Sequence, residues 1–366
     1  MPPLSVMIKP ASGLCNLRCK YCFYGDVTSL RDVPSYGVMT EKTAEKIVSS
    51  ALEFADGETV AFAFQGGEPL LAGKKLFGFF VDTVKKYNTK NSRIFYSVQT
   101  NGTLIDDEWA EFFAKNKILV GLSLDGDFDA NAFRVDEKGA NSYYRILRGA
   151  GLLRKHGAEF NILSVLTGKS AVNCERIYRH LKNSGFNYIQ FIPCLRPFGC
   201  KDESELYMTN EQYADFLIRI FNLYVKDFVR GQYVSIRFFD NLVRMYLGEK
   251  PEQCGMCGHC THQFVAEANG NIYPCDFYCT DEYLLGNINL SSLESLAKSK
   301  KAEDFIKESP VIPDKCRICE FFTLCRAGGC KRMRADRDFC KAYKIFFSTC
   351  LPLFTVFRKK SENKLT

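Results

Sequence analysis

The segment that decides the fold is Cys15-Asn16-Leu17-Arg18-Cys19-Lys20-Tyr21-Cys22, in which three cysteines follow one another as C-x3-C-x2-C. It comes directly after a run of residues that predicts a strand over 5–10. Three thiolates at this spacing can ligate three irons of a cubane [4Fe–4S] cluster and leave the fourth iron open. The alternatives are a structural zinc knuckle with a distant fourth ligand, or three buried thiols.

The cysteine content of the whole chain is unusual. Its 366 residues include 17 cysteines, too sparse for a small disulfide scaffold and dense for an ordinary cytosolic enzyme. The first residues lack the basic and apolar regions of a secretory signal, so we expect a cytoplasmic protein with metal-binding or catalytic thiolates rather than disulfides. The longest apolar run, 345–357, contains Pro352 and is too short to cross a bilayer. A dispersed net charge of +7 argues against nucleic-acid binding.

Strand-like and helix-like segments alternate along the first two-thirds of the chain, which predicts βαβ units and a parallel sheet. Strands are expected over 5–10, 59–65, 93–99, 118–124, 160–166 and 188–192. Helices are expected over 41–55, 74–87, 106–115, 143–156, 173–183, 210–229 and 235–247. Six such units fit either a partial barrel or an open doubly wound sheet.

The pattern changes after residue 250. Eleven cysteines lie between 254 and 350, among short regular segments only. This composition is typical of a domain that metal–ligand bonds hold together. We therefore expect two domains, 1–250 and 251–366.

The first cysteine segment, with an aromatic residue just before its third cysteine, resembles the signature of radical S-adenosylmethionine (SAM) enzymes. Gln65-Gly66-Gly67-Glu68-Pro69, Gln99-Thr100-Asn101-Gly102-Thr103 and Ser123-Leu124-Asp125-Gly126 extend the resemblance, each after a predicted strand. The resemblance implies a partial (β/α)6 TIM-like barrel with an open cluster on Cys15, Cys19 and Cys22. One electron from that cluster would cleave SAM to a 5′-deoxyadenosyl radical. The SAM site would be lined by Tyr21, Gly67, Ser123, Arg134 and Leu195.

The C-terminal cysteines resemble the SPASM extension, which holds two auxiliary [4Fe–4S] clusters. The likeness assigns one cluster to Cys254, Cys260, Cys275 and Cys330, and the other to Cys316, Cys319, Cys325 and Cys340. Four residues separate Cys325 from Cys330, where three are usual, so a loop adjustment is implied. Two structural zinc sites are the alternative, since C-x2-C is a common zinc knuckle.

Over nearly the whole chain, the resemblance is closest to the anaerobic sulfatase-maturating enzymes. These enzymes oxidise Cβ of a Cys or Ser in an unfolded sulfatase polypeptide, within a Cys/Ser-x-Pro/Ala-x-Arg-type motif, to Cα-formylglycine. Asp276 is the candidate base, because it directly follows a cluster ligand and a carboxylate in a water-poor pocket can have a raised pKa. Tyr24, Gln65 and Gln99 are expected to bind the peptide. A flavodoxin or ferredoxin-type protein would donate electrons.

Three other functions compete with this one. A SPASM enzyme that forms thioether or carbon–carbon crosslinks in a ribosomal peptide often carries an extra N-terminal domain, for which a first cluster at Cys15 leaves no room. Cys194 and Cys200 lie beside the expected substrate entrance, so a different peptide substrate remains an alternative. A non-catalytic iron–sulfur electron carrier would need neither an open iron nor the glycine-rich segments. A zinc-stapled nucleic-acid binder is disfavoured by the dispersed charge.

Overall fold

The computed structural model describes residues 4–201, 204–336 and 338–362. Its contacts divide the chain into two compact units, each assembled from separate segments. The first unit consists of Met1–Ser123, Ala132–Phe160 and Thr261–Lys307. The second consists of Leu124–Asn131, Asn161–Cys260 and Glu308–Thr366. The predicted division into domains 1–250 and 251–366 stays a prediction.

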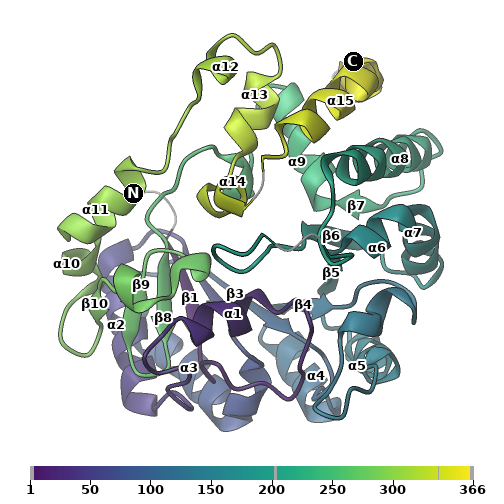
Figure 1. Cartoon of the computed structure of the whole chain (residues 1–366). Coiled ribbons are helices and arrows are strands. Elements are labelled where there is room, and N and C mark those ends of the chain that lie inside the picture. Colours follow the sequence, from purple (N-terminus) through teal and green to yellow (C-terminus); the bar gives the residue numbers. More distant parts are fainter. Residues whose placement is uncertain (1–3, 202–203, 337, 363–366) are drawn as a thin grey trace. The chain divides into compact units, whose positions relative to one another are not determined.

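The first unit is built on a sheet whose parallel strands run in the order β8-β1-β2-β3-β4. These strands are β1 (Leu4–Lys9), β2 (Val60–Phe64), β3 (Ile94–Thr100), β4 (Ile118–Ser123) and β8 (Phe264–Glu267). The antiparallel strands β9 (Asn271–Tyr273) and β10 (Gly286–Asn287) continue the sheet beyond β8. Green β8 lies beside purple β1 in Figure 1, with β9 on its other side, so a late segment of the chain extends the N-terminal sheet.

Helices of the first unit pack apolar faces against one another and against the sheet. They are α1 (Phe23–Ser29), α2 (Glu41–Ala55), α3 (Lys74–Tyr87), α4 (Asp107–Lys115), α5 (Tyr143–His156), α10 (Leu293–Ala297) and α11 (Lys300–Lys307). The sequence sets their ends locally. Helix α2 begins after Thr40, whose hydroxyl accepts a hydrogen bond from the Thr43 amide, and is followed by the C-cap residue Asp56, whose φ is 50°.

The second unit combines three parallel strands with a helical layer. The strands are β5 (Phe160–Leu166), β6 (Tyr188–Pro193) and β7 (Ser235–Ile236). The helices are α6 (Gly168–Val172), α7 (Cys174–Asn183), α8 (Asn210–Val229), α9 (Arg237–Tyr246), α12 (Asp314–Arg317), α13 (Phe322–Cys325), α14 (Lys331–Asp336), α15 (Cys340–Cys350) and α16 (Thr355–Glu362). Aromatic rings form its core, where Phe221 of α8 lies 5.5 Å from Phe346 and 4.6 Å from Phe354 between ring centroids.

The six predicted strands correspond to β1–β6, with each boundary within one residue. The predicted helices correspond to α2, α3, α4, α5, α7, α8 and α9. The expectation of only short segments up to residue 350 was wrong, because α15 runs for 11 residues. Its N-cap residue, Phe339, makes no side-chain capping hydrogen bond, so the usual start signal is missing at that position. Within the described residues, no helix is both long and apolar enough to span a bilayer.

Candidate functional site

The loop between β1 and α1 carries the cysteines of the C-x3-C-x2-C motif, Cys15, Cys19 and Cys22. The Cys22 sulfur caps α1 by accepting a hydrogen bond from the Gly25 amide at 3.4 Å. The Cys15 sulfur accepts from the Leu17 amide at 3.4 Å and from the Asn101 side chain at 3.9 Å. None of the three cysteines is fully buried. Partly accessible thiols with N–H donors on their sulfurs fit a cluster that must admit a further ligand.

The Gly66-Gly67 segment after β2 packs directly on this loop. The Gly67 amide donates to the Ser12 carbonyl at 2.9 Å, and the Glu68 amide donates to the Leu14 carbonyl at 2.7 Å. A Cβ atom at Gly67 would lie 2.0 Å from the Leu14 oxygen, closer than any side chain allows. The position therefore requires glycine because the backbone of the cysteine loop occupies the space.

Replacing Gly67 with Ala is expected to displace the cysteine loop and weaken SAM binding by at least about tenfold, roughly 1.4 kcal/mol. The measurement is equilibrium SAM binding to the anaerobically reconstituted protein, together with iron per chain. Gly78→Ala is the matched control, because a Cβ at that helical position meets no atom within 4 Å. Wild-type SAM affinity in the Gly67 variant would contradict this account of the segment.

Glu68 links the glycine segment to the end of β3. Its fully buried carboxylate accepts hydrogen bonds from the Thr100 hydroxyl at 2.7 Å, from the Asn101 amide at 2.8 Å and from the Leu70 amide at 3.1 Å. Burial raises the pKa of Glu68 to about 7, although these donors oppose the rise. Glu68 thereby holds the segments that follow β2 and β3 and the cysteine loop together at the carboxyl ends of these strands.

Of the residues predicted to bind SAM, the structure brings Arg134 and Tyr21 into contact. Arg134 lies over the ring of Tyr21, with its guanidinium carbon 5.4 Å from the ring centroid. Ser123, at the end of β4, accepts a hydrogen bond from the predicted peptide-binding residue Gln99 at 2.8 Å. Leu195 is buried and follows β6 in the second unit. Contact of these residues with SAM stays a prediction.

Four cysteines of the second unit line one small pocket, together with Phe321 and Tyr343. They are Cys316, Cys319, Cys325 and Cys340, the set that the SPASM resemblance assigns to one auxiliary cluster. Burial raises the pKa of the Cys325 thiol to about 11. Within the described residues, no three His, Cys, Asp or Glu side chains are close enough to hold a single metal ion. The wider arrangement of four thiols fits a [4Fe–4S] cluster.

The other predicted ligand set is divided between the units, with Cys254, Cys260 and Cys330 in the second and Cys275 in the first. Gly255, next to Cys254, packs on Cys330, because a Cβ there would lie 4.0 Å from the Cys330 Cβ. The extra residue before Cys330 is accommodated by four successive positive φ angles, from Arg326 to Gly329. The completion of this set by Cys275 stays a prediction.

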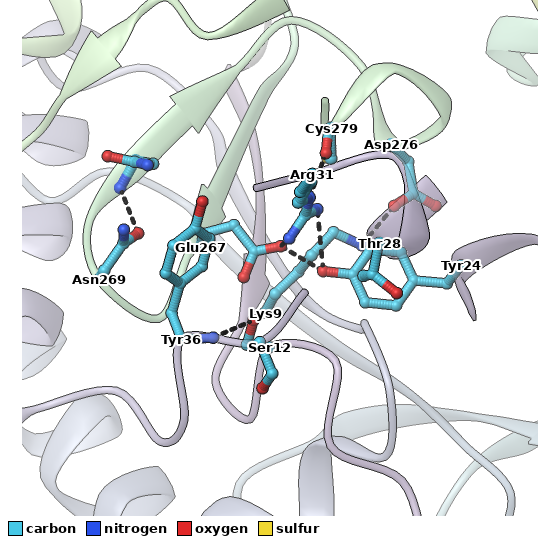
Figure 2. A network of polar contacts seen from close by, with 12 residues as sticks. Lys9, Ser12, Tyr24, Thr28, Arg31, Tyr36, Glu267, Asn269, Asp276 and Cys279 are labelled. Atoms are coloured by element: carbon cyan, nitrogen blue, oxygen red, sulfur yellow. Dashed lines mark hydrogen bonds and ion pairs between the residues drawn. The ribbon is translucent and has the colours of Figure 1, made fainter. Parts of the chain in front are cut away.

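Asp276 follows Cys275, and its carboxylate contacts Lys9 at the end of β1 (Figure 2) and Gln65, the residue directly after β2. The Lys9 ammonium forms an ion pair with its Oδ1 atom. The amide nitrogen of Gln65 donates to its Oδ2 atom at 2.9 Å. Thus the predicted base and a predicted peptide-binding residue are in direct contact.

The Lys9 ammonium also lies 3.8 Å from the centroid of the Tyr24 ring. The Tyr24 hydroxyl donates to Glu267, which forms an ion pair with Arg31 at 2.8 Å. Burial and the charge of Glu267 raise the pKa of Tyr24 well above its usual value. Burial alone would lower the pKa of Lys9, but the charges of Asp276 and Glu267 raise it overall.

Sequence reasoning missed Lys9, Arg31 and Glu267. The signal that could have found two of them is a charged residue inside an apolar strand, since Lys9 ends β1 and Glu267 ends β8. Tyr24 was expected to bind the peptide, and the structure places its buried hydroxyl on Glu267. Peptide contacts of Tyr24, Gln65 and Gln99 stay predictions.

Two family models match the chain. The radical SAM superfamily matches residues 10–190, and an iron–sulfur cluster-binding domain, SPASM, matches residues 254–320. The cysteine-type anaerobic sulfatase-maturating enzyme of Clostridium perfringens strain 13 is 43% identical over 96% of this chain and 97% of its own length. The Clostridium novyi enzyme of the same name is 41% identical over 98% of both chains. A serine-type enzyme from Bacteroides thetaiotaomicron is 31% identical over 99% of this chain and 93% of its own.

Solved structures of an anaerobic sulfatase-maturating enzyme also resemble this chain over nearly its whole length. "Native anSMEcpe with bound AdoMet" is 42% identical, with a TM-score of 0.92 over 97% of this chain and 99% of that one. "Native anSMEcpe with bound AdoMet and Cp18Cys peptide" also gives 0.92, over 98% of this chain and 99% of that one. The expected α/β radical SAM fold with a SPASM extension is confirmed, as are SAM and three [4Fe–4S] clusters as cofactors. The chain belongs to the family of anaerobic sulfatase-maturating enzymes.

Proposed function

We propose that the enzyme oxidises Cβ of a cysteine in an unfolded sulfatase segment and so produces Cα-formylglycine. The observation that carries this proposal is the placement of Asp276, a carboxylate fixed from two sides directly after Cys275. The relatives support cysteine as the target, since those at 41–43% identity are named cysteine-type and the one at 31% is named serine-type. A solved relative that contains a peptide supports a polypeptide substrate.

The reaction is a two-electron oxidation, and this chain's residues divide its parts. Cys15, Cys19 and Cys22 would hold the open cluster, which together with SAM would supply hydrogen-atom abstraction at Cβ, and the auxiliary clusters would supply an acceptor for the second electron. Asp276 takes the thiol proton, and Gln65 orients that carboxylate through Oδ2. The resulting carbon–sulfur double bond is hydrolysed, so water provides the aldehyde oxygen and sulfur leaves as hydrogen sulfide.

The test is an anaerobic assay of the reconstituted enzyme with SAM, dithionite and a short Cys-x-Pro-x-Arg peptide. We expect one 5′-deoxyadenosine per peptide aldehyde, and a lower rate with the Ser-x-Pro-x-Arg peptide. SAM cleavage without any change in the peptide would contradict the substrate assignment. A peptide that loses two hydrogens and gains a thioether or carbon–carbon bond would instead support a crosslinking enzyme.

For the physiological electron donor we propose a flavodoxin or ferredoxin-type protein. Each SAM cleavage uses one electron, and these small carriers deliver electrons singly. Replacing dithionite in the same assay with a reduced flavodoxin is expected to sustain 5′-deoxyadenosine formation.

A further inference from the structure

We propose that Lys9 is a positioning residue, whose buried ammonium fixes the orientation of the Asp276 carboxylate toward the substrate thiol. The inference rests on the function proposed above, since it concerns the group assigned there as the base. It adds a residue from the first strand of the sheet to the proton-accepting part of the site.

The contacts of Asp276 leave its carboxylate little freedom. Lys9, the last residue of β1, donates to Oδ1, and Gln65, the first residue after β2, donates to Oδ2 at 2.9 Å, so each oxygen has its own donor. The Lys9 side chain is 0% exposed, whereas the Asp276 side chain is 12% exposed. The carboxylate is therefore the end of this pair that can meet another molecule. Both of its oxygens keep lone pairs for a thiol proton.

Lys9 is itself held in place. Because the lysine side chain is flexible, it can position another group only if its own ammonium is fixed. The face of Tyr24 lies 3.8 Å from the Lys9 ammonium, an electrostatic contact of a cation with a ring. The Tyr24 hydroxyl donates to Glu267, and Arg31 pairs with Glu267 at 2.8 Å with both side chains 0% exposed. Figure 2 shows this chain of contacts from Arg31 through Tyr24 to Lys9 and Asp276.

The network connects the two cluster-binding segments of the first unit. Tyr24 lies two residues after Cys22, and Asp276 directly follows Cys275. Lys9 contacts both. The rings of Phe23 and Phe277, whose centroids are 5.1 Å apart, pack the same two segments together. Lys9 thereby ties the position of the base to the loop that carries the open cluster.

Lys9→Met tests the proposal, because it keeps the apolar stem and removes the ammonium. We expect SAM cleavage and peptide affinity to stay within about twofold of wild type. The yield of formylglycine per 5′-deoxyadenosine should fall about 10- to 100-fold, as misplacement of a catalytic group does. Lys85→Met is the matched control, since that side chain is 67% exposed and lies on the surface. A role in stability alone would lower both yields together and leave their ratio unchanged.

A double variant keeps the test decisive if the single variant folds poorly, since an unpaired buried charge is costly. Lys9→Met with Asp276→Asn removes both charges, so no unpaired charge is left. If Lys9 acts through Asp276, the yield of formylglycine per 5′-deoxyadenosine is the same in the double variant as in Asp276→Asn alone. The proposal would be overturned by a wild-type yield of formylglycine per 5′-deoxyadenosine in Lys9→Met, or by a yield in the double variant below that of Asp276→Asn. Absence of formylglycine from the wild-type enzyme would instead overturn the proposed function.

Discussion

The Asp276→Asn enzyme is expected to cleave SAM at close to the wild-type rate while it oxidises the peptide about 10³-fold more slowly, which is the usual contribution of a general base. Asparagine keeps the shape of the side chain but cannot accept the thiol proton. The radical would still form, so 5′-deoxyadenosine would accumulate without a matching amount of aldehyde. The measurement is both products, quantified by mass spectrometry in the same anaerobic reaction.

Two controls separate a lost base from a damaged fold. Asp82→Asn makes the same chemical change at a side chain that is 75% exposed, and it should leave both products unchanged. Because Asp276→Asn also leaves the Lys9 ammonium without its counter-ion, iron per chain and thermal stability must be compared with wild type. An Asp276→Asn enzyme that makes aldehyde and deoxyadenosine in the wild-type ratio would remove Asp276 as the base.

Replacing Cys15 and Cys22 together with Ala is expected to abolish SAM cleavage altogether. The iron content of the reconstituted protein should fall from about twelve to about eight atoms per chain, because each of the three clusters holds four. The auxiliary clusters should remain, since their predicted ligands are other cysteines. Iron analysis and 5′-deoxyadenosine formation with dithionite are the two measurements.

Cys174→Ala is the matched control for that variant. Cys174 is a buried cysteine at the start of α7, outside every predicted ligand set, and its loss should leave the iron content unchanged. A fall to about four iron atoms in the Cys15/Cys22 variant would show that these thiols also support another cluster. Persistent SAM cleavage would show that the open cluster lies elsewhere.

The regular elements could be predicted from the sequence where a local pattern sets them. Strand β1 alternates between buried and partly exposed positions over most of its length, and α2 begins after a threonine that caps it. Helix α1 escaped prediction because it has only seven residues and its cap is Cys22, which is not a usual capping residue. Strands β9 and β10 span three and two residues, too short for any period to show.

The candidate site divides in the same way. Its cysteines stand in motifs of fixed spacing, and Asp276 could be proposed because it directly follows Cys275. The contact of Lys9 with Asp276 joins positions 267 residues apart and depends on how β8 pairs with β1. That register is set by the packing of both strands, and no local pattern encodes it. The contact of the Tyr24 hydroxyl with Glu267 could not be predicted for the same reason, since Glu267 lies on β8. Binding of the peptide by Tyr24 stays a prediction.

The pairing of β1 with β8 also sets the order of events while the chain is being made. β1 leaves the ribosome first, but its neighbour β8 follows only after more than 250 further residues have been translated. At ordinary rates of chain elongation this delay is on the order of ten to fifty seconds. During that time one edge of β1 lacks its strand partner, and the nascent chain is open to association with others. Arrival of β8 and the following turn closes the edge and supplies the counter-charges of Lys9 and Arg31, so the pairing of β1 and the charge network around Asp276 are completed in one late step.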